Sequence, residues 1–305
     1  MDKSNLKVWL NGKMVGYGDA KVPILTHSLQ YGSGIFEGIR AYKTESGPAI
    51  FRLSDHVRRF IETAKIYSIN LGYGAKEIEN AIIEVVLQNK LDSCYIRPFA
   101  FYDDDNIGIS VANKHVSVYI AAIPFGNYFG DAKNTGIRCK ISSWKRINSD
   151  ILPIRAKASG NYINSIIAGN EARASGYDEA ILLSHNGYVA EGPGENLFIV
   201  RNGRLLTPGA DSDILFGVTR DTIIKIAPRL DIQVVEGNIH KEELYIAEEA
   251  FFSGTAAEIT PIVNIDGIKT GSGSMGKTTQ KISEYYELLV SGKAPESKDW
   301  LTKVK

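Results

Sequence analysis

The sequence predicts an α/β protein of the mixed α+β kind, built from two domains of which the larger is rich in strands. Its 305 residues exceed the usual size of one domain, about 100 to 200 residues. Asn-Gly pairs between apolar alternations indicate antiparallel hairpins, and other stretches repeat apolar residues at helical spacing. Turn-forming and aromatic residues near the middle predict the boundaries: a small domain 1–124, an interdomain loop 125–134 and a large domain 135–305.

Short apolar runs that end at turn residues predict the strands. Three of these runs precede an Asn-Gly pair, and two flank the interdomain loop. The expected strands are Val8–Leu10, Val116–Ile123, Gly136–Ser142, Ala180–Leu183 and Leu197–Val200.

Apolar residues at spacings of three and four predict helices over several other stretches. In the first of them, Val57, Ile61, Ala64 and Ser68 share a face behind a cap at Ser54 and Asp55. Pro228 interrupts the fourth helix, so its last turn is not expected to continue regularly. The expected helices are Ser54–Ile69, Glu77–Leu91, Gly160–Ser175, Thr219–Leu230 and Lys277–Val290.

The balance of charges argues against a nucleic-acid or membrane-surface partner. Lys plus Arg and Asp plus Glu both total 35, so no global field attracts a polyanion. Cys94 and Cys139 lack a paired spacing, which is typical of reduced thiols in a cytosolic protein. No pair of histidines has the spacing of a metal site, and no apolar run reaches the length of a membrane span. We therefore expect a cytoplasmic protein without a metal.

Lys157 is the first candidate for chemistry. Small residues flank it in Ala156-Lys157-Ala158-Ser159-Gly160, which would let a bulky group approach the amine. An ordinary surface lysine is the bland interpretation. The apolar pairs Tyr162-Ile163 and Ile166-Ile167 would place the lysine beside a buried helix, where loss of water favours the neutral, nucleophilic amine.

Three further clusters could bind a charged ring and an anion. Glu191 ends a predicted strand and is followed by the bend Gly192-Pro193-Gly194, for which a loop with solvated glutamates is the alternative. Gly217-Val218-Thr219 would start a helix whose amides could bind phosphate, although simple capping by Thr219 fits equally. Ser253-Gly254-Thr255 offers a hydroxyl and closely spaced amides, or forms an ordinary tight turn.

The stretch Gly271 to Thr278 satisfies both the GxGxxG pattern and the P-loop pattern GxxxxGK[ST]. Taken literally, it predicts a nucleotide-binding enzyme. The stretch lies too close to the C-terminus for the parallel sheet that such sites need. A flexible loop before the last helix is the preferred interpretation. A Ser159–His185 hydrolase is a weaker alternative, since no GxSxG elbow is present.

Taken together and in order, these clusters resemble the branched-chain aminotransferases of the class IV pyridoxal-phosphate transaminases. The resemblance spans nearly the whole chain and adds two early motifs, Phe36-Glu37-Gly38-Ile39-Arg40 and Tyr95-Ile96-Arg97-Pro98, to the clusters at Lys157, Glu191, Gly217 and Ser253. It implies the fold-type-IV architecture and transfer of an amino group from L-leucine, L-isoleucine or L-valine to 2-oxoglutarate, with pyridoxal 5′-phosphate as cofactor.

The resemblance also implies residue roles. Lys157 would be the catalytic residue that holds the cofactor covalently and moves the proton, while Glu191 would face the pyridine nitrogen. Glu195 would be a structural carboxylate. The implied cofactor-binding residues are Arg59, Lys157, Tyr162, Glu191, Val218, Thr219 and Thr255. The implied substrate-binding residues are Tyr31, Phe36, Arg40, Tyr95, Arg97, Ile107, Ile109, Phe125, Tyr128, Thr255 and Ala256.

Within the substrate set, Arg97 would take a distal carboxylate, and Ile107 and Ile109 would come from a neighbouring subunit. The implied assembly is a homodimer at least, and the resemblance leaves a hexamer open. Phe125 stands where many members carry tryptophan, which would widen the substrate site slightly. A D-amino-acid transaminase or an aminodeoxychorismate lyase of the same fold is the nearest alternative, and Tyr95, Arg97 and Gly254-Thr255-Ala256-Ala257 favour the branched-chain activity.

Overall fold

The computed structural model describes residues 3–105, 107–126, 128–130 and 135–305, so part of the expected interdomain loop lies outside the described residues. Contacts along the chain define two compact units. Unit 1 comprises Met1–Gly126, Ala156–Gly160 and Leu288–Lys305, and unit 2 comprises Asn127–Arg155 and Asn161–Glu287. Each unit contains its own sheet.

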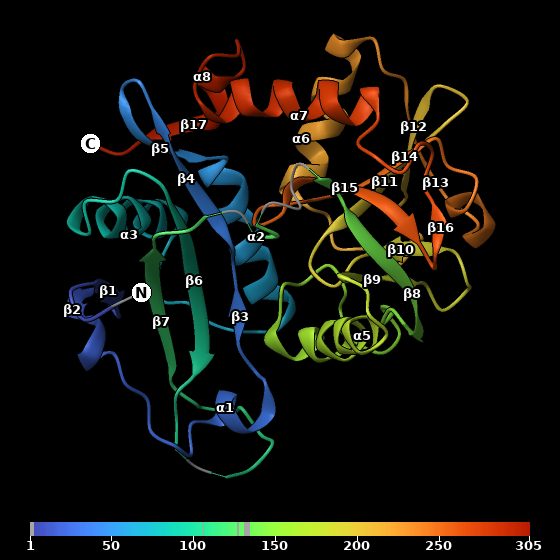
Figure 1. Ribbon diagram of the computed structural model, residues 1–305. Helices are drawn as coiled ribbons and strands as arrows, with labels where there is room; N and C mark the ends of the chain where they lie inside the picture. The colour runs from blue at the N-terminus through green and yellow to red at the C-terminus, as the bar shows by residue number, and fades with distance from the viewer. Residues whose placement is uncertain (1–2, 106, 127, 131–134) are drawn as a thin grey trace. The chain divides into compact units, whose positions relative to one another are not determined.

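Unit 1 is built on an antiparallel sheet with the strand order β17-β5-β4-β6-β7-β1-β2, and β3 pairs with β6 (Figure 1). Asn11 and Gly12 form the first hairpin turn with φ values of 47° and 86°, the left-handed backbone that this dipeptide tolerates. The strand bounds are β1 Lys7–Leu10, β2 Lys13–Gly16, β3 Ile35–Phe36, β4 Ile39–Thr44, β5 Gly47–Phe51, β6 Cys94–Tyr102, β7 Val116–Ile123 and β17 Leu301–Lys303.

Two long helices of unit 1, α2 Leu53–Ile66 and α3 Ala75–Gln88, pack against each other, and α3 also contacts β6 and β7 (Figure 1). The predicted start of α2 was wrong, because Arg52 caps it with a left-handed φ of 51°. Its buried face consists of Leu53, His56, Val57, Phe60, Thr63 and Ala64, whereas Ser68 is exposed. Short helices complete the unit: η1 Tyr17–Asp19, α1 His27–Tyr31 and α8 Ser297–Trp300.

Unit 2 is built on a mixed sheet with the order β10-β9-β8-β15-β14-β11-β12-β13, and β16 pairs with β15. An additional pairing of β10 with β11 closes β8, β9, β10, β11, β14 and β15 into a ring. The strand bounds are β8 Ile137–Lys145, β9 Glu179–Leu183, β10 Val189–Glu191, β11 Asn196–Arg201, β12 Arg204–Pro208, β13 Val234–Gly237, β14 Glu249–Gly254, β15 Glu258–Ile265 and β16 Ile268–Lys269.

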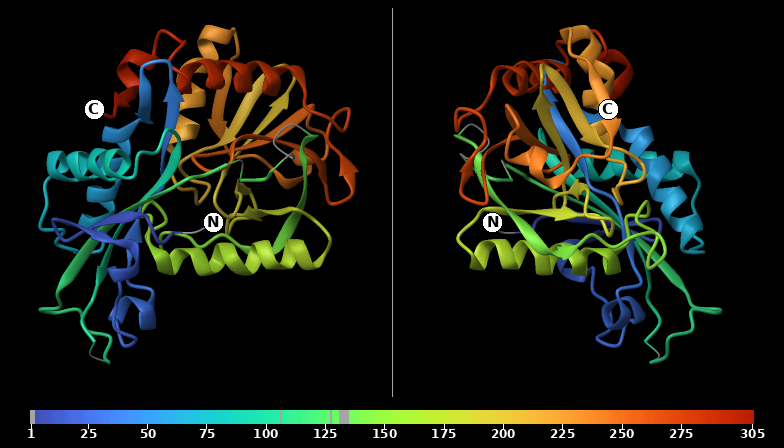
Figure 2. Two further views of the ribbon diagram at one scale, coloured as in Figure 1. Left: turned by 60° about the vertical axis from the view of Figure 1, so that its left-hand side comes forward. Right: turned by 90° about the vertical axis from the view of Figure 1, so that its right-hand side faces the viewer.

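The helices of unit 2 largely match the predicted ranges. Helix α5 Tyr162–Ala174 contacts β8 and β9 (Figure 2). Helix α6 Val218–Ile226 changes to the 3-10 helix η3 Ala227–Leu230 next to Pro228, as the proline predicted. The remaining helices are η2 Ser159–Asn161, η4 Lys241–Leu244 and α7 Lys277–Val290, the first and last of which cross the boundary between the units. None of the helices in the described residues could span a bilayer.

Candidate active site

The backbone around Lys157 is held by two elements of unit 1, α2 and β3. Its amide donates to Thr63 Oγ1 of α2 at 3.2 Å, and its carbonyl accepts from the amide of Phe36 in β3 at 3.0 Å. Ala158 forms a bridge with Ile35. The Lys157 amine lies 5.1 Å from the centre of the Phe36 ring, and the residue is half-buried. The lysine therefore has a fixed backbone and an aromatic neighbour.

The helix that follows Lys157 is not buried through its isoleucines. Ile163 and Ile166 are 61% and 51% exposed, and α5 instead buries Ser165, Ala168, Gly169 and Ala172. The expectation of a buried helix beside the lysine was wrong in this respect. Small residues allow α5 to approach its sheet closely, so the isoleucines are left on the outer face.

Arg59 lies on α2 and makes a two-pronged contact with Glu37. Its Nε donates to Glu37 Oε1 at 2.6 Å and its Nη2 donates to Oε2 at 2.9 Å. His56 Nδ1 contacts Oε2 at 2.8 Å, and Glu37 is completely buried. Glu37 belongs to a motif of the resemblance but carried no predicted role, and no sequence pattern indicated a role for His56. A carboxylate inside the apolar stretch Ile35 to Ile39 was the available signal.

Arginine and aromatic side chains alternate on β3, β4 and β6 of unit 1. The Arg97 guanidinium lies 4.5 Å from the Phe36 ring centre and donates to Tyr95 Oη at 3.3 Å. Tyr95 and Phe125 have ring centres 5.0 Å apart, and Arg40 lies 5.4 Å from the Phe125 ring. The structure thus brings five predicted substrate residues into one array. Tyr95 and Arg97 also line a cavity of about 690 Å³.

Four other predicted substrate residues are exposed and lie on loops or at a helix end. Tyr31, which ends α1, is 43% exposed and its hydroxyl accepts from the amide of Gly108 at 3.2 Å. Ile107 and Ile109 are 75% and 83% exposed, and Tyr128, which belongs to unit 2, is 52% exposed. Gly108 therefore ties the loop that carries both isoleucines to Tyr31.

Glu191 in unit 2 is buried and held by several donors, so the alternative of a solvated glutamate was wrong. Its Oε1 accepts from Arg146 Nε at 2.8 Å. Its Oε2 accepts from Asn196 Nδ2 at 3.0 Å and from the amide of Leu215 at 3.1 Å. Charge-assisted bonds of this kind stabilise an ionised carboxylate. Sequence reasoning missed Arg146, because nothing around it indicated proximity to Glu191.

One predicted anion cluster of unit 2 lies at a helix start and the other at a turn, but the alternative of a Thr219 cap was wrong. Helix α6 begins at Val218 behind Gly217, not behind a Thr219 cap, and no side chain caps it. An added Cβ at Gly217 would come within 2.1 Å of Asn196 Oδ1, so this glycine leaves room for the side chain that holds Glu191. Thr255 and Ala256 lie in the turn that joins β14 to β15.

Comparison with known proteins decides the family. A model of the family "Amino-transferase class IV" matches residues 34–265. The branched-chain-amino-acid aminotransferase of Escherichia coli (strain K12) is 44% identical over 299 residues, which cover 97% of this chain and 97% of that protein. The chain belongs to the class IV aminotransferase family. The predicted family is confirmed.

Solved structures of relatives confirm the predicted fold. The Escherichia coli enzyme superposes with a TM-score of 0.96 at 43% identity, covering 98% of this chain and 99% of that chain. A branched-chain aminotransferase from Thermoproteus uzoniensis with norvaline gives a TM-score of 0.94 at 48% identity with the same coverage. One from Thermobaculum terrenum in its PLP-form gives 0.94 at 34% identity, covering 100% of both chains.

The P-loop pattern does not form a phosphate site in this family member. The carboxylate of Glu249 occupies the start of α7, where it accepts from the amides of Thr278 and Thr279 at 2.9 and 2.7 Å and from Thr279 Oγ1 at 2.7 Å. A Cβ at Gly276 would lie 2.1 Å from Glu249 Cδ, so the glycine admits this carboxylate. A helix start that already binds a negative charge repels a phosphate.

Glu249→Ala is expected to lower the free energy of unfolding by about 0.5 to 2 kcal/mol, because the cap of α7 is lost. Chemical denaturation measures this change, and kcat with L-leucine should stay at the wild-type value. Glu284→Ala, on the exposed face of the same helix, is the matched control and should change stability by less than about 0.5 kcal/mol. Tight ATP binding by the wild-type protein would contradict the capping role.

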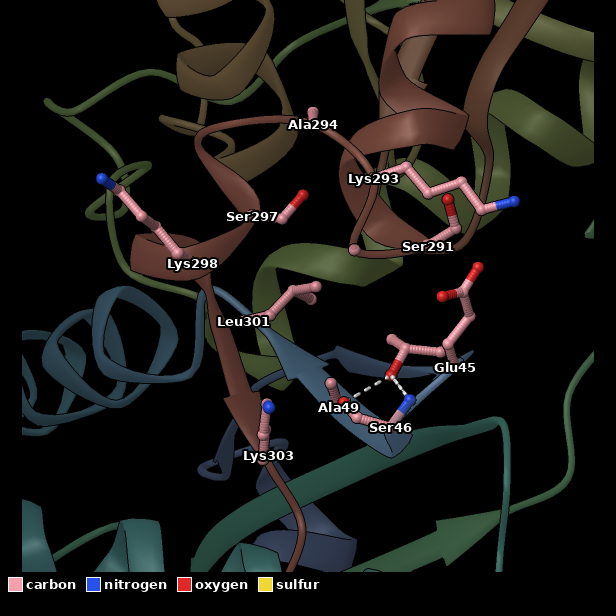
Figure 3. Close-up of a pocket in the computed structure, with 12 residues that line it drawn as sticks. Glu45, Ser46, Ala49, Ser291, Lys293, Ala294, Ser297, Lys298, Leu301 and Lys303 are labelled. Atoms are coloured by element: carbon pink, nitrogen blue, oxygen red, sulfur yellow. Dashed lines mark hydrogen bonds between the residues drawn. The ribbon is translucent and has the colours of Figure 1, made fainter.

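A lysine-lined cavity of about 420 Å³ in unit 1 also falls short of a built anion site (Figure 3). Lys293, Lys298 and Lys303 line it, but all three are exposed, and Lys298 points away from the Glu45 side. The neighbouring hydroxyls already donate to carbonyl oxygens: Thr44 to Gly47, Ser291 to Leu288 and Ser297 to Leu289. Exposed, solvated lysine amines alone do not form a site that selects one anion over another.

Proposed function

We propose that this chain is a transaminase that moves the amino group of L-leucine, L-isoleucine or L-valine to 2-oxoglutarate, giving branched 2-oxo acids and L-glutamate. Pyridoxal 5′-phosphate is its cofactor. The activity and cofactor that the resemblance implied are confirmed by the relatives described above. In this chain, the proposal is supported above all by the Arg97 guanidinium, which lies over the rings of Phe36 and Tyr95.

This arrangement suits two unlike substrates. Phe36 is 7% exposed and offers an apolar wall to a branched side chain, while Arg97 can bind the distal carboxylate of glutamate. Arg97 Nε is buried without a hydrogen-bond partner in the described residues, so it retains donor capacity for a ligand. We assign the α-carboxylate to Tyr95 and to the amides of Thr255 and Ala256, and the remaining wall to Tyr31, Arg40, Phe125 and Tyr128.

The polar groups of each unit fit the chemistry of the cofactor. In unit 1, Arg59 is the proposed phosphate ligand and Lys157 the covalent anchor. In unit 2, the amides at Val218 and Thr219 with Thr255 also serve the phosphate, and Tyr162 serves the phenolic oxygen. Glu191 is a buried carboxylate with a fixed orientation, as a protonated ring nitrogen requires. When bound, the cofactor supplies an electron sink for the substrate carbon that loses its proton.

Lys157 performs the proton transfer in this proposal. Its amine would remove the proton from the substrate Cα and deliver it to C4′ of the cofactor, so one side chain would act as base and then as acid. The hydrogen bonds of the Lys157 backbone with Thr63 and Phe36 keep the backbone in one place while the side chain moves the amine. Glu191 would keep a proton on the ring nitrogen of the bound cofactor, so that the ring can accept the electrons left at the substrate Cα.

We further propose that the chain works as a homodimer at least, with Ile107 and Ile109 reaching a neighbouring subunit, and that it is cytoplasmic. Their 75% and 83% exposure supports the first point, since isolated apolar loop tips gain from burial in a partner. The domain boundaries 1–124, 125–134 and 135–305 also stay a proposal. Analytical ultracentrifugation tests the assembly: a purely monomeric active enzyme would contradict it.

Two experiments test the proposed function. Borohydride reduction followed by peptide mass spectrometry should place a pyridoxyl group on Lys157. A panel of amino donors should show L-leucine, L-isoleucine and L-valine as substrates. Activity with D-alanine but not with L-leucine would favour the D-amino-acid alternative within the same fold.

Gly38→Ala is expected to lower kcat/KM for L-leucine by up to about 10²-fold, because a small displacement of a substrate ligand can cost that much. A Cβ at Gly38 would lie 1.9 Å from Tyr95 Oη, so the ring must move away from Arg97. Gly18→Ala is the control, since its Cβ would meet nothing within 4 Å. Steady-state kinetics with L-leucine compare the two variants. Unchanged kinetics in Gly38→Ala would remove Tyr95 from the carboxylate site.

A further inference from the structure

Glu37, His56 and Arg59 form a buried cluster in unit 1 that the proposed mechanism leaves partly unused. The Glu37 side chain is 0% exposed, His56 is 1% exposed and Arg59 is 12% exposed. Four donor groups face the Glu37 carboxylate: Arg59 Nε and Nη2, His56 Nδ1, and the amide of Gly38 at 3.1 Å. Both oxygens of the Glu37 carboxylate therefore accept hydrogen bonds.

The cluster lies beside the backbone that positions Lys157. The residue before Glu37, Phe36, donates its amide to the Lys157 carbonyl, and the Glu37 amide donates to the Pro98 carbonyl at 2.9 Å. Helix α2 supplies His56 and Arg59 one turn apart, and one turn later it supplies Thr63, which accepts from the Lys157 amide. One polar stripe on α2 therefore serves both the lysine backbone and the arginine.

The protonation states of the cluster follow from its surroundings. Burial raises the pKa of Glu37, but the charge of Arg59 and the hydrogen bonds from His56 and Arg59 outweigh it and hold the pKa well below its usual range. Burial lowers the pKa of His56, Arg59 and Lys157 add to this effect, and Glu37 opposes it. At neutral pH the carboxylate is ionised and the imidazole is neutral, with Nδ1 as the donor.

Stability alone is a poor reason for such a cluster. Removing two charges from water is costly, so well-packed apolar residues often stabilise a fold as well or better. Orientation is a better reason. A guanidinium is a planar fork, and a two-pronged contact through Nε and Nη2 fixes the direction of its other edge.

We propose that Glu37 and His56 are positioning residues that lock the plane of the Arg59 guanidinium so that it binds the cofactor phosphate. This inference rests on the proposed function, in which Arg59 is a phosphate ligand. Glu37 touches neither phosphate nor substrate in this scheme and acts only through Arg59.

The opposite explanation predicts an effect of opposite sign. If Glu37 merely neutralised a buried arginine, its removal would leave an uncompensated positive charge that attracts phosphate more strongly. Orientation predicts weaker binding, because the amide of glutamine would present a donor to the donors of Arg59 and His56. The direction of the change in affinity therefore separates the two explanations.

The experiment measures binding of pyridoxal 5′-phosphate and of pyridoxal, which lacks the phosphate, to the full-length apoenzyme by visible absorbance. Glu37→Gln should raise the Kd for pyridoxal 5′-phosphate by about 10- to 100-fold, the range for a charge-assisted contact, and should leave the Kd for pyridoxal unchanged. Glu62→Gln is the matched control, since Glu62 is exposed on the same helix. It should bind both compounds as the wild type does.

A double-mutant cycle with Arg59→Lys tests whether Glu37 acts through the arginine. In the Arg59→Lys background, Glu37→Gln should change the Kd for pyridoxal 5′-phosphate less than threefold. If Glu37→Gln does not fold, His56→Phe provides the same comparison with an expected rise of about 3- to 10-fold, because one donor is lost.

Tighter or unchanged binding of pyridoxal 5′-phosphate by a folded variant would overturn the positioning role, as would an equal loss for pyridoxal. A wild-type apoenzyme that takes up neither compound would instead refute the proposed function. The two failures are therefore distinguishable.

Discussion

Lys157→Ala is expected to reduce kcat with L-leucine by at least about 10²- to 10⁴-fold, the share of the rate that positioned proton transfer supplies. The variant should also release its cofactor on dialysis, because the covalent anchor is lost while the phosphate ligands remain. The Lys157 backbone bonds to Phe36 and Thr63 do not depend on the side chain, so we expect the fold to survive. Stopped-flow kinetics and absorbance after dialysis measure the two effects.

Lys277→Ala is the control for this result. Lys277 is the lysine of the P-loop pattern, yet it is exposed and stands beside a helix start that Glu249 already occupies. Its replacement should leave kcat and cofactor content at wild-type values. The reverse outcome, with Lys277 essential and Lys157 dispensable, would return the chain to the nucleotide-binding alternative.

Glu191→Gln is expected to reduce kcat by about 10²- to 10³-fold, the usual effect of removing one preorganised electrostatic group. Glutamine removes the negative charge, and its amide group would face the donors of Arg146, or those of Asn196 and Leu215. Cofactor content should be retained, because Lys157 and the phosphate ligands are intact. Single-turnover kinetics with L-leucine, together with the absorbance of the bound cofactor, measure both quantities.

Glu195→Gln is the matched control for Glu191→Gln. Glu191 ends β10 and Glu195 lies in the loop that joins β10 to β11, and both are buried, at 4% and 5% exposure. Glu195 accepts from the amide of Gly194 and has no assigned part in the chemistry. We expect its variant to keep kcat within a few-fold of the wild type. Equal losses in the two variants would show that loop stability, and not the charge of Glu191, sets the rate.

Sequence patterns predicted the helices and hairpins that depend only on residues close together in the chain. Helix α7 occupies the predicted range Lys277–Val290, because its apolar face repeats regularly and Gly292, with a φ of 85°, follows its end. The Asn-Gly hairpins at Asn11 and Asn202 formed for the same reason. The hairpin between β15 and β16 was missed, although Asp266-Gly267 carries an equivalent signal with φ values of 50° and 85°.

Features that depend on distant contacts could not be predicted in this way. Arg146 and Glu191 are 45 residues apart, and Glu37 and Arg59 are 22 residues apart. No spacing rule links such pairs. The resemblance to a family supplied the chemical residues, whereas the residues that hold them became visible only in the folded chain. The P-loop pattern was misleading for the same reason, since Glu249, which occupies its helix start, lies on β14, 30 residues from Thr279.

The ring of strands in unit 2 has a consequence for the durability of the enzyme. A single residue pair, Glu191 opposite Asn196, joins β10 to β11 and closes the ring. The same two side chains share a hydrogen bond. The junction between β10 and β11 therefore carries the carboxylate that we propose for the ring nitrogen of the cofactor. Partial opening of this junction would misplace Glu191 while the remaining strands stay paired. Inactivation on heating would then begin as a local event, ahead of the loss of the whole domain.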